Sequence, residues 1–440
     1  MDEEDSAENN SEPGPSIIIK TVESSSDDFE QITEAVNEEI SNTAALLYYC
    51  QCKIIRPYSR VLCVMGLRPS TAGIPEQYCC LKVCNILHLT FVLVLMCVGY
   101  LLQYITCFRR DRGFDYKAVP TLAASTIKLQ DHEHVCYDNI VFSYIVPSVL
   151  HFSAYIYTMT LFRINDNEQL QNLMERALLV SDGSMAQCRI VHTLWISIGL
   201  SILWMSTSLV IVSIMVADGT LVFHWLGHSP IIVLKMLKVL LALSTLWHDM
   251  VQATLITSYC LQSQLLSLHV RSLGNKLLQH SLCPVEWMRE MCEFRKLLKY
   301  LNEDLAPTVC ILSIVNISYA ASGAVWLLKY DTVDTETRPI SGISILNVIL
   351  WGLIAIAPFI QAARLTSACM AIRNIGHEVR PRPYVYESTP RQDLDSILLY
   401  TSSLRMTSKL FKVPVTGRYL CMFLALLAIV VITLGQCHTF

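Results

Sequence analysis

Charged residues are scarce in this 440-residue chain: they make up 16% of it, against roughly 25% in soluble proteins. Hydrophobic residues make up 53%. The net charge of −4 is not spread over the chain, because 13 of the 37 acidic residues lie in Met1–Glu39. The remaining residues are therefore even poorer in charge than the average. A chain with so little charge over the rest of its length is not an ordinary soluble domain.

Motifs of the common enzyme classes are also absent. The sequence has no Walker phosphate loop, no His-Glu-x-x-His zinc motif, no Gly-x-Ser-x-Gly elbow and no glycine-rich dinucleotide turn. The Asp-Arg-Tyr and Asn-Pro-x-x-Tyr motifs of G-protein-coupled receptors are missing too. We therefore expect no enzyme, no cofactor and no nucleic-acid partner.

The 17 cysteines lack the spacing of a disulfide framework or a zinc site. Cys50 and Cys52 have no matching second pair of cysteines or histidines, so no metal site is expected. Cys107 and Cys136 fall in one predicted loop. The sequence leaves open whether they form a disulfide or remain separate thiols.

The N-terminal segment has no apolar core of the kind that a cleavable signal peptide requires. Its acidity and its few aromatic residues predict that residues 1–43 form a disordered cytosolic tail. Residues 44–82 mix apolar and basic side chains. We expect them to form one or two short helices along the inner membrane surface.

Seven apolar stretches are each long enough to cross a membrane, which takes about 20 helical residues for a core of about 30 Å. They are Val83–Thr106, Asn139–Phe162, Ile190–Val216, Ile231–Tyr259, Leu305–Leu328, Gly342–Met370 and Arg418–Gln436. The sequence therefore predicts an all-α protein with seven transmembrane helices, six of them within residues 83–370.

Lysine and arginine gather in alternate loops between these stretches. The segment just before the first span, together with the loops after the second, fourth and sixth spans, holds 22 basic residues. The loops after the first, third and fifth spans, together with the last four residues, hold 7. Because basic residues remain on the cytoplasmic side, we expect a cytoplasmic N-terminus and an extracellular C-terminus. A G-protein-coupled receptor has the reverse orientation.

Helical patterns continue beyond the fourth and sixth spans on the predicted cytoplasmic side. Residues 260–304 are expected to form two antiparallel helices, whose apolar faces either bind a partner or pack on each other. In residues 371–416, an amphipathic helix is expected over Asp393–Lys412, ended by Pro414. Residues 417–440 would then form the last span.

Two ionisable residues, Asp249 and Arg364, are predicted to lie deep in the fourth and sixth spans. A charge buried in a bilayer costs roughly 2.5–3.5 kcal/mol, so such residues usually face a partner or water. Both lie toward the inner ends of their spans, which would allow them to pair. Alternatively, each reaches the interface at its own helix end.

The length, the orientation, the cytosolic extension and the amphipathic helix before a short last span together resemble the insect gustatory receptor family. The C-terminal signature of that family is Thr-Tyr, five mostly apolar residues, and Gln-Phe. Here only Gln436 matches it, and Ile429, Val430 and Cys437 stand at the other signature positions.

The resemblance implies a ligand-gated, non-selective cation channel in the plasma membrane, assembled as a tetramer of this chain or with related subunits. Its cytosolic parts of helices 4 to 7 would form an anchor domain, and its last span would line the pore. Gln436 would lie near the outer mouth, Thr433 one turn inward, and Ile429 and Ile432 below. One polar ring among apolar rings suits a gate that closes by excluding water.

The resemblance also implies that a small molecule binds within each subunit, among the outer halves of spans 2 to 6. Aromatic and polar residues in that region are Tyr144, His151, Trp204, Lys235, Lys238, Trp326, Asn347 and Trp351. Such side chains also gather at membrane interfaces and in packing seams. The poorly matched C-terminal window leaves one alternative open, a non-conducting seven-span adaptor or scaffold.

Overall fold

The computed structural model describes most of the chain and confirms the seven predicted spans. The described residues are 44–69, 79–106, 108–111, 140–164, 169–180, 184–217, 230–330, 338–381, 387 and 389–437. Seven helices among them are long and apolar enough to cross a membrane: Lys82–Ile105, Val141–Arg163, Gln187–Val216, Ile231–Leu278, Pro284–Leu328, Gly342–Val379 and Gly417–Leu434. The acidic segment, Cys107 and Cys136 lie outside the described residues.

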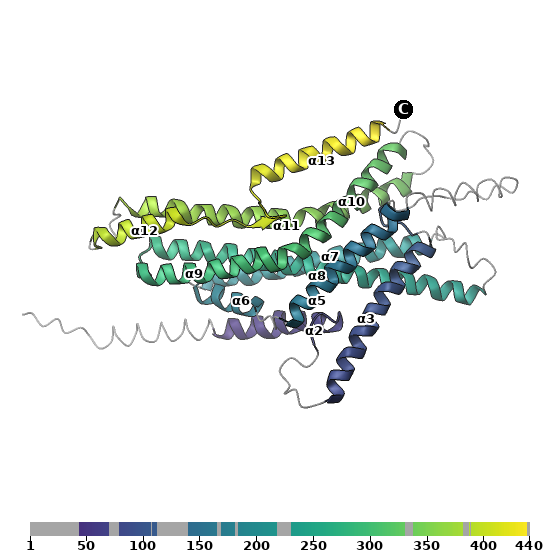
Figure 1. The fold of residues 1–440 in the computed structure, drawn as a ribbon, viewed down its shortest axis with the longest axis horizontal. Coiled ribbons are helices and arrows are strands. Elements are labelled where there is room, and N and C mark those ends of the chain that lie inside the picture. The colour runs from purple at the N-terminus through teal and green to yellow at the C-terminus, as the bar shows by residue number, and fades with distance from the viewer. Residues whose placement is uncertain are drawn as a thin grey trace, which may run out of the picture.

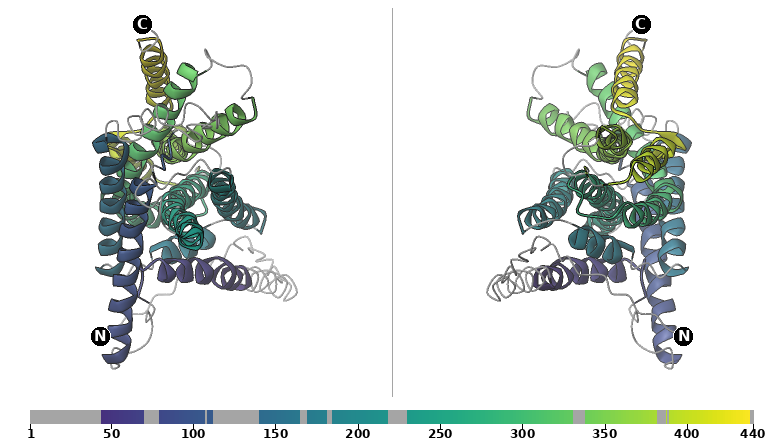
Figure 2. Two further views of the ribbon diagram at one scale, coloured as in Figure 1. Left: turned by 90° about the vertical axis from the view of Figure 1, so that its right-hand side faces the viewer. Right: turned by 90° about the vertical axis from the view of Figure 1, so that its left-hand side faces the viewer.

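Nearly all described elements are helical. In chain order they are η1 (Gln51–Ile55), α2 (Arg56–Val64), α3 (Cys79–Ile105), η2 (Val141–Ile145), α5 (Val146–Ile164), α6 (Gln169–Val180), α7 (Ser184–Ala217), α8 (Ile231–Leu278), α9 (Pro284–Tyr300), η4 (Leu301–Leu305), α10 (Ala306–Tyr330), α11 (Arg338–Val379), α12 (Arg391–Ser403), β1 (Lys409–Leu410), β2 (Val413–Pro414) and α13 (Gly417–Cys437). In Figures 1 and 2, α3 and α13 lie at opposite edges of the molecule, with α8 between them.

Three π-helical turns, η1, η2 and η4, share one cause in the sequence. Each ends two residues before a proline, namely Pro57, Pro147 and Pro307. A proline lacks the backbone N–H and its ring clashes with the carbonyl four residues earlier. The residue before each proline donates instead to the carbonyl five residues back, as Ala306 does to Leu301. The widened turn lets the helix continue past the proline.

Beyond the apolar spans, α8, α9, α11 and α12 form a helical bundle, which we call the anchor bundle (Figure 1). At about 1.5 Å per residue, the 48 residues of α8 extend about 70 Å, far more than a bilayer core requires. Trp287 of α9 is fully buried and its Nε1 donates to the Leu273 carbonyl of α8 at 3.0 Å. The apolar stripes left open by the sequence therefore pack against other helices of the same chain.

Helix α12 closes the anchor bundle through Leu394 and Ile397, which are buried. Tyr400 packs edge-on against Trp287, with ring centroids 6.0 Å apart. Burial, with a further contribution from its hydrogen bond to Cys292, raises the pKa of Tyr400 to about 12. The phenol therefore stays neutral at physiological pH and acts here as a hydrogen-bonding and packing group.

The prediction of one helix over Asp393–Lys412 is wrong in its second half. Helix α12 ends at Ser403, and the chain then forms a hairpin from β1 and β2, with Leu410 opposite Val413. The amide side chain of Asn302 accepts from the Lys409 N–H at 2.8 Å and donates to the Thr407 carbonyl at 3.0 Å. These hydrogen bonds to η4 satisfy an extended backbone where the apolar pattern alone indicated a helix.

Helix α13 follows the hairpin and lies at one edge of the molecule, beside α10 (Figures 1 and 2). Its most apolar window is 0% buried within the chain. It packs against α10 and α11, where Phe423 stacks on Phe359 with ring centroids 5.7 Å apart.

Candidate functional site

A buried ion pair joins Arg110, just after α3, to Asp249 of α8. The Asp249 side chain is 1% exposed, and its second oxygen accepts from Ser208 Oγ of α7 at 2.6 Å. The predicted pairing of Asp249 with Arg364 is wrong, because Arg364 is exposed on α11. Asp249 does not reach an interface either. Its negative charge is balanced by an arginine that the sequence places in a loop.

Trp351 packs directly on this pair, and Trp204 packs on Trp351. The Arg110 guanidinium lies 5.0 Å from the ring centroid of Trp351, a cation–π contact. Trp351 Nε1 and Asn347 Nδ2 both donate to the Arg110 carbonyl, at 3.2 and 3.0 Å. Trp204 packs edge-on against Trp351, with centroids 5.7 Å apart. Two predicted ligand residues, Asn347 and Trp351, thus hold Arg110 directly, and a third, Trp204, supports Trp351.

A second aromatic cluster joins α3, α5 and α8. Tyr100 stacks on His248 with centroids 4.4 Å apart, and its hydroxyl lies 2.6 Å from Nδ1 of His151. Tyr144 packs edge-on against Tyr104 at 5.7 Å. Both predicted residues of this region, Tyr144 and His151, are buried in packed contacts between helices.

The segment 108–111 forms the boundary between these clusters and an open pocket. Arg109 and Asp111 pair with each other at 2.8 Å, and Ser322 Oγ of α10 donates to Asp111 at 2.7 Å. A Cβ at Gly323 would lie only 2.5 Å from the Asp111 carbonyl oxygen. The small residue at that position allows the segment to lie directly on α10.

The pocket has a volume of about 510 Å³ and lies between η2 and α5 on one side and α10 on the other. This volume falls within the roughly 300–1,000 Å³ that is usual for small-molecule sites. Its lining combines apolar side chains with a few polar ones: Arg109, Asp111, Phe142, Ser143, Val146, Pro147, Leu150, Ile314, Val315, Ser318, Tyr319 and Ser322. Such a surface suits a mainly apolar molecule with one or two hydrogen-bonding groups.

None of the predicted ligand residues lines this pocket. Trp326 is half-buried on α10, Lys235 is exposed and Lys238 is half-buried on α8. Tyr319 links the pocket to the interior, because it lines the pocket and packs on Trp351 with centroids 5.0 Å apart. In the sequence, the pair Ser318 and Ser322, one helical turn apart in an apolar span, could have indicated a polar patch at this pocket.

The predicted pore residues lie on the exposed second half of α13. Ile429 is 59% exposed and Ile432 is 51% exposed. Thr433 Oγ1 donates to the Ile429 carbonyl at 2.9 Å, and Gln436 is exposed. The described part of the chain leaves about half of the surface of these apolar side chains uncovered, so lipid or other protein chains must cover the rest.

A stack of three aromatic rings connects the hairpin, α11 and α13. Phe359 of α11 stacks on Phe411 of the hairpin at 6.3 Å and on Phe423 of α13 at 5.7 Å. The Phe411 N–H also lies 3.1 Å from Cys310 Sγ of α10. Phe359 is two turns from Trp351 on the same helix, so a movement of α11 would displace both side chains together.

Comparison with known proteins finds similarity in structure alone. No family model matches the sequence, and no curated protein matches it. The insect olfactory receptor OR5 from Machilis hrabei superimposes with a TM-score of 0.55 and 12% identity, over 89% of this chain and 98% of that chain. The same receptor in complex with eugenol gives a TM-score of 0.54 and 11% identity, over 88% and 100%.

Identities this low establish a shared fold and nothing further. The superposition nevertheless covers almost the whole of both chains, so it extends over the spans and the anchor bundle together. This chain therefore has the seven-helix fold of an insect olfactory receptor.

Proposed function

We propose that the chain is a chemosensory receptor of the insect gustatory and olfactory superfamily, of gustatory type. It acts as a ligand-gated, non-selective cation channel in the plasma membrane. Four subunits, copies of this chain or related chains, assemble around a central pore. The N-terminus is cytoplasmic and the C-terminus extracellular, as the distribution of 22 and 7 basic residues between alternate loops favours.

The observation that carries this proposal is the exposed helix α13 on a fold shared with an insect olfactory receptor. An apolar span that is 0% buried in its own chain has to be covered in the membrane. Assembly of four chains around an axis covers one face of α13 with its copies and leaves another face to lipid. The pore-facing side would then carry Gln436, Thr433, Ile432 and Ile429.

The proposed ligand site is the 510 Å³ pocket between α5 and α10. Tyr319 and Trp351 provide a mechanical route from this pocket to α11, and Phe359 extends the route to the hairpin and α13. A ligand that separates α5 from α10 would shift this chain of aromatic contacts. The predicted set of Tyr144, His151, Trp204, Trp326, Asn347 and Trp351 acts in this scheme mainly by supporting the pocket.

Current recordings test the proposal. Cells that express the chain, alone or with related receptor subunits, should show a cation current when a panel of small organic tastants is applied. Gln436→Ala should change ion permeation or block, because the residue would lie near the outer mouth of the pore. Gln51→Ala, the same change on a helix remote from α13, should leave permeation unaltered. Identical permeation in both variants would remove Gln436 from the pore.

The alternative is a non-conducting adaptor or scaffold with the same fold. The C-terminal window motivates it, because Ile429, Val430 and Cys437 occupy three of the four positions of the gustatory signature. A chain that reaches the cell surface, assembles with its subunits and never conducts would favour this alternative over the channel.

A further inference from the structure

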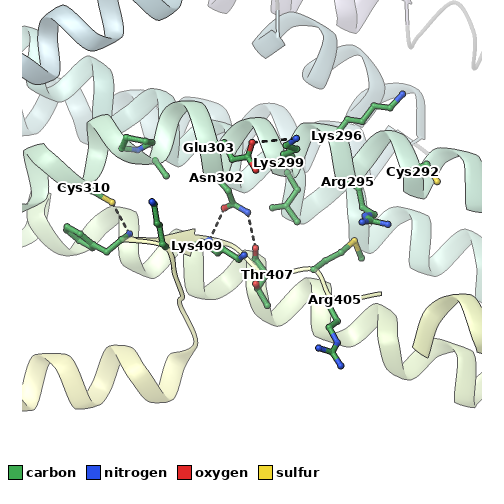
Figure 3. Close-up of a pocket in the computed structure, with 16 residues that line it drawn as sticks. Cys292, Arg295, Lys296, Lys299, Asn302, Glu303, Cys310, Arg405, Thr407 and Lys409 are labelled. Carbon is green, nitrogen blue, oxygen red and sulfur yellow. Dashed lines mark hydrogen bonds and ion pairs between the residues drawn. The ribbon is translucent and has the colours of Figure 1, made fainter. Parts of the chain in front are cut away.

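We propose that a basic groove between the anchor bundle and the hairpin binds a ligand with clustered phosphate groups. The groove has a volume of about 860 Å³ and is lined by α9, η4, the start of α10 and the segment from Arg405 to Lys412 (Figure 3). The inference goes beyond the proposed channel function, since neither the tastant pocket nor the pore residues contribute to it.

Positive charge dominates the lining of the groove. Six basic residues line it, against Glu303 as the one acidic residue: Arg295, Lys296, Lys299, Arg405, Lys409 and Lys412. They come from two segments about a hundred positions apart in the sequence, so helix periodicity alone does not bring them together. Arginine and lysine at this density match phosphate groups, which accept several charge-assisted hydrogen bonds.

Only part of this charge is neutralised within the described chain. Lys296 Nζ lies 2.7 Å from Glu293, and Lys299 Nζ lies 3.6 Å from Glu303. Among the residues that the structure describes, Arg295, Arg405, Lys409 and Lys412 have no carboxylate within ion-pair distance. Like charges held together repel one another, and an anion in the groove would relieve that repulsion.

The hairpin side of the groove is fixed in place rather than loose. Asn302 holds the backbone of Lys409 and Thr407 through the two hydrogen bonds already described, both drawn in Figure 3. The N–H of Phe411 is held by Cys310 Sγ at 3.1 Å. Because their backbone is positioned in advance, the basic side chains lose less conformational freedom when they bind an anion.

The position of the groove suggests where the phosphate comes from. It lies where α10 enters its apolar span and just before α13 begins at Gly417, on the side with more basic loops. In a membrane this is the level of the inner headgroups, where basic pockets next to spans bind polyphosphorylated inositol lipids. A soluble polyphosphate offers the same chemistry, so the test has to separate the two sources.

The test uses the purified full-length chain in lipid nanodiscs. Binding is measured for phosphatidylinositol bisphosphate in a phosphatidylcholine bilayer, for phosphatidylserine at equal total charge, and for soluble inorganic tripolyphosphate. Stronger binding of the inositol lipid than of phosphatidylserine supports a lipid headgroup. Tight binding of tripolyphosphate without anionic lipid supports a free polyphosphate. Equal binding of both lipids with no binding of tripolyphosphate would overturn the proposal.

Variants separate the groove from general charge. The double variant Arg295→Gln and Lys409→Gln should weaken binding about a hundredfold, since each of the two lost charge-assisted hydrogen bonds is worth about a factor of ten. The matched pair Arg373→Gln and Arg380→Gln removes the same charge from exposed positions outside the groove and should change binding less than about twofold. Equal losses in both pairs would overturn the proposal.

Two further measurements exclude unfolding and the channel function as causes. Thermal unfolding of each variant reports whether it folds, and the conservative pair Arg295→Lys and Lys409→Arg should restore most of the binding. Loss of binding in that folded conservative pair, matching the loss in the glutamine pair, would contradict a site that depends on positive charge. Because binding is measured without any current, a chain that fails to conduct can still pass this test.

Discussion

At the scale of single residues, the Arg110–Asp249 pair places two opposite charges in the interior, where the two side chains are 7% and 1% exposed. A buried ion pair adds little stability compared with a well-packed apolar pair, but removing one partner leaves an uncompensated buried charge. Ser208, Trp351 and Asn347 hold both partners, so the site cannot relax easily. The pair fixes the segment that forms the boundary of the candidate ligand pocket.

We expect Asp249→Leu to destabilise the folded protein by about 3–5 kcal/mol, because Arg110 would remain charged and buried. Adding Arg110→Met should recover much of this loss, since an apolar pair of similar volume needs no charge balance. Thermal unfolding of the single and double variants in one detergent measures the effect. A double variant that is less stable than the sum of the single changes would contradict the ion pair.

Ser318 lies in the wall of the 510 Å³ pocket, so a large side chain there should fill it. Ser318→Phe is expected to abolish or strongly weaken the response to any tastant that opens the channel, while surface expression stays near normal. Ser213→Phe places the same ring on the exposed face of α7 and is the matched control. Equal ligand sensitivity in both variants would exclude this pocket as the ligand site.

At the scale of elements, the hairpin between α12 and α13 carries local backbone strain. Phe411 and Lys412 form its two-residue turn and have φ values of 55° and 62°. Turns of this kind favour asparagine and glycine, because other residues clash in the left-handed region. The contacts of Phe411 with Cys310 and Phe359 stabilise this strained conformation. The element that leads into the proposed pore helix is therefore fixed by tertiary packing rather than by its own sequence.

Lys412→Gly should stabilise the protein by about 0.5–1 kcal/mol, since glycine removes the left-handed penalty and the Lys412 side chain is exposed. Lys409→Gly removes the same charge at an extended position of β1 and should instead destabilise by about 0.5–1 kcal/mol. The two unfolding temperatures, followed by tryptophan fluorescence, should move in opposite directions. Shifts of the same sign would contradict the strained turn.

The transmembrane spans, the π-helical turns and the hairpin differ in how far the sequence predicts them. Each span was predictable because crossing a hydrocarbon core requires a long apolar run, and at the end away from the anchor bundle the predicted and observed bounds agree closely. The π-helical turns could have been inferred from Pro57, Pro147 and Pro307. The hairpin could not, because its hydrogen-bond partner Asn302 lies about a hundred residues away.

At the scale of the whole molecule, the interior contacts depend on which helices are neighbours. The pattern of apolar residues in one sequence does not reveal those neighbours. Arg110 was missed as the partner of Asp249 because a residue between spans is expected to lie at the surface. The residues of the 510 Å³ pocket come from the 108–111 segment, η2, α5 and α10, which are separate in the sequence and meet only in the folded chain. Among the predicted ligand residues, Trp204, Asn347 and Trp351 were correctly placed in spans, but their contacts with Arg110 and with one another could not be read from the sequence.

Single-particle electron microscopy of the purified chain in nanodiscs tests most directly the proposal that α13 lines a pore at the axis of a four-subunit assembly. We expect particles with four copies around one axis, α13 innermost, and Gln436 and Thr433 facing the axis. Single chains with α13 surrounded by lipid, or an assembly with α13 on its outer surface, would contradict the claim.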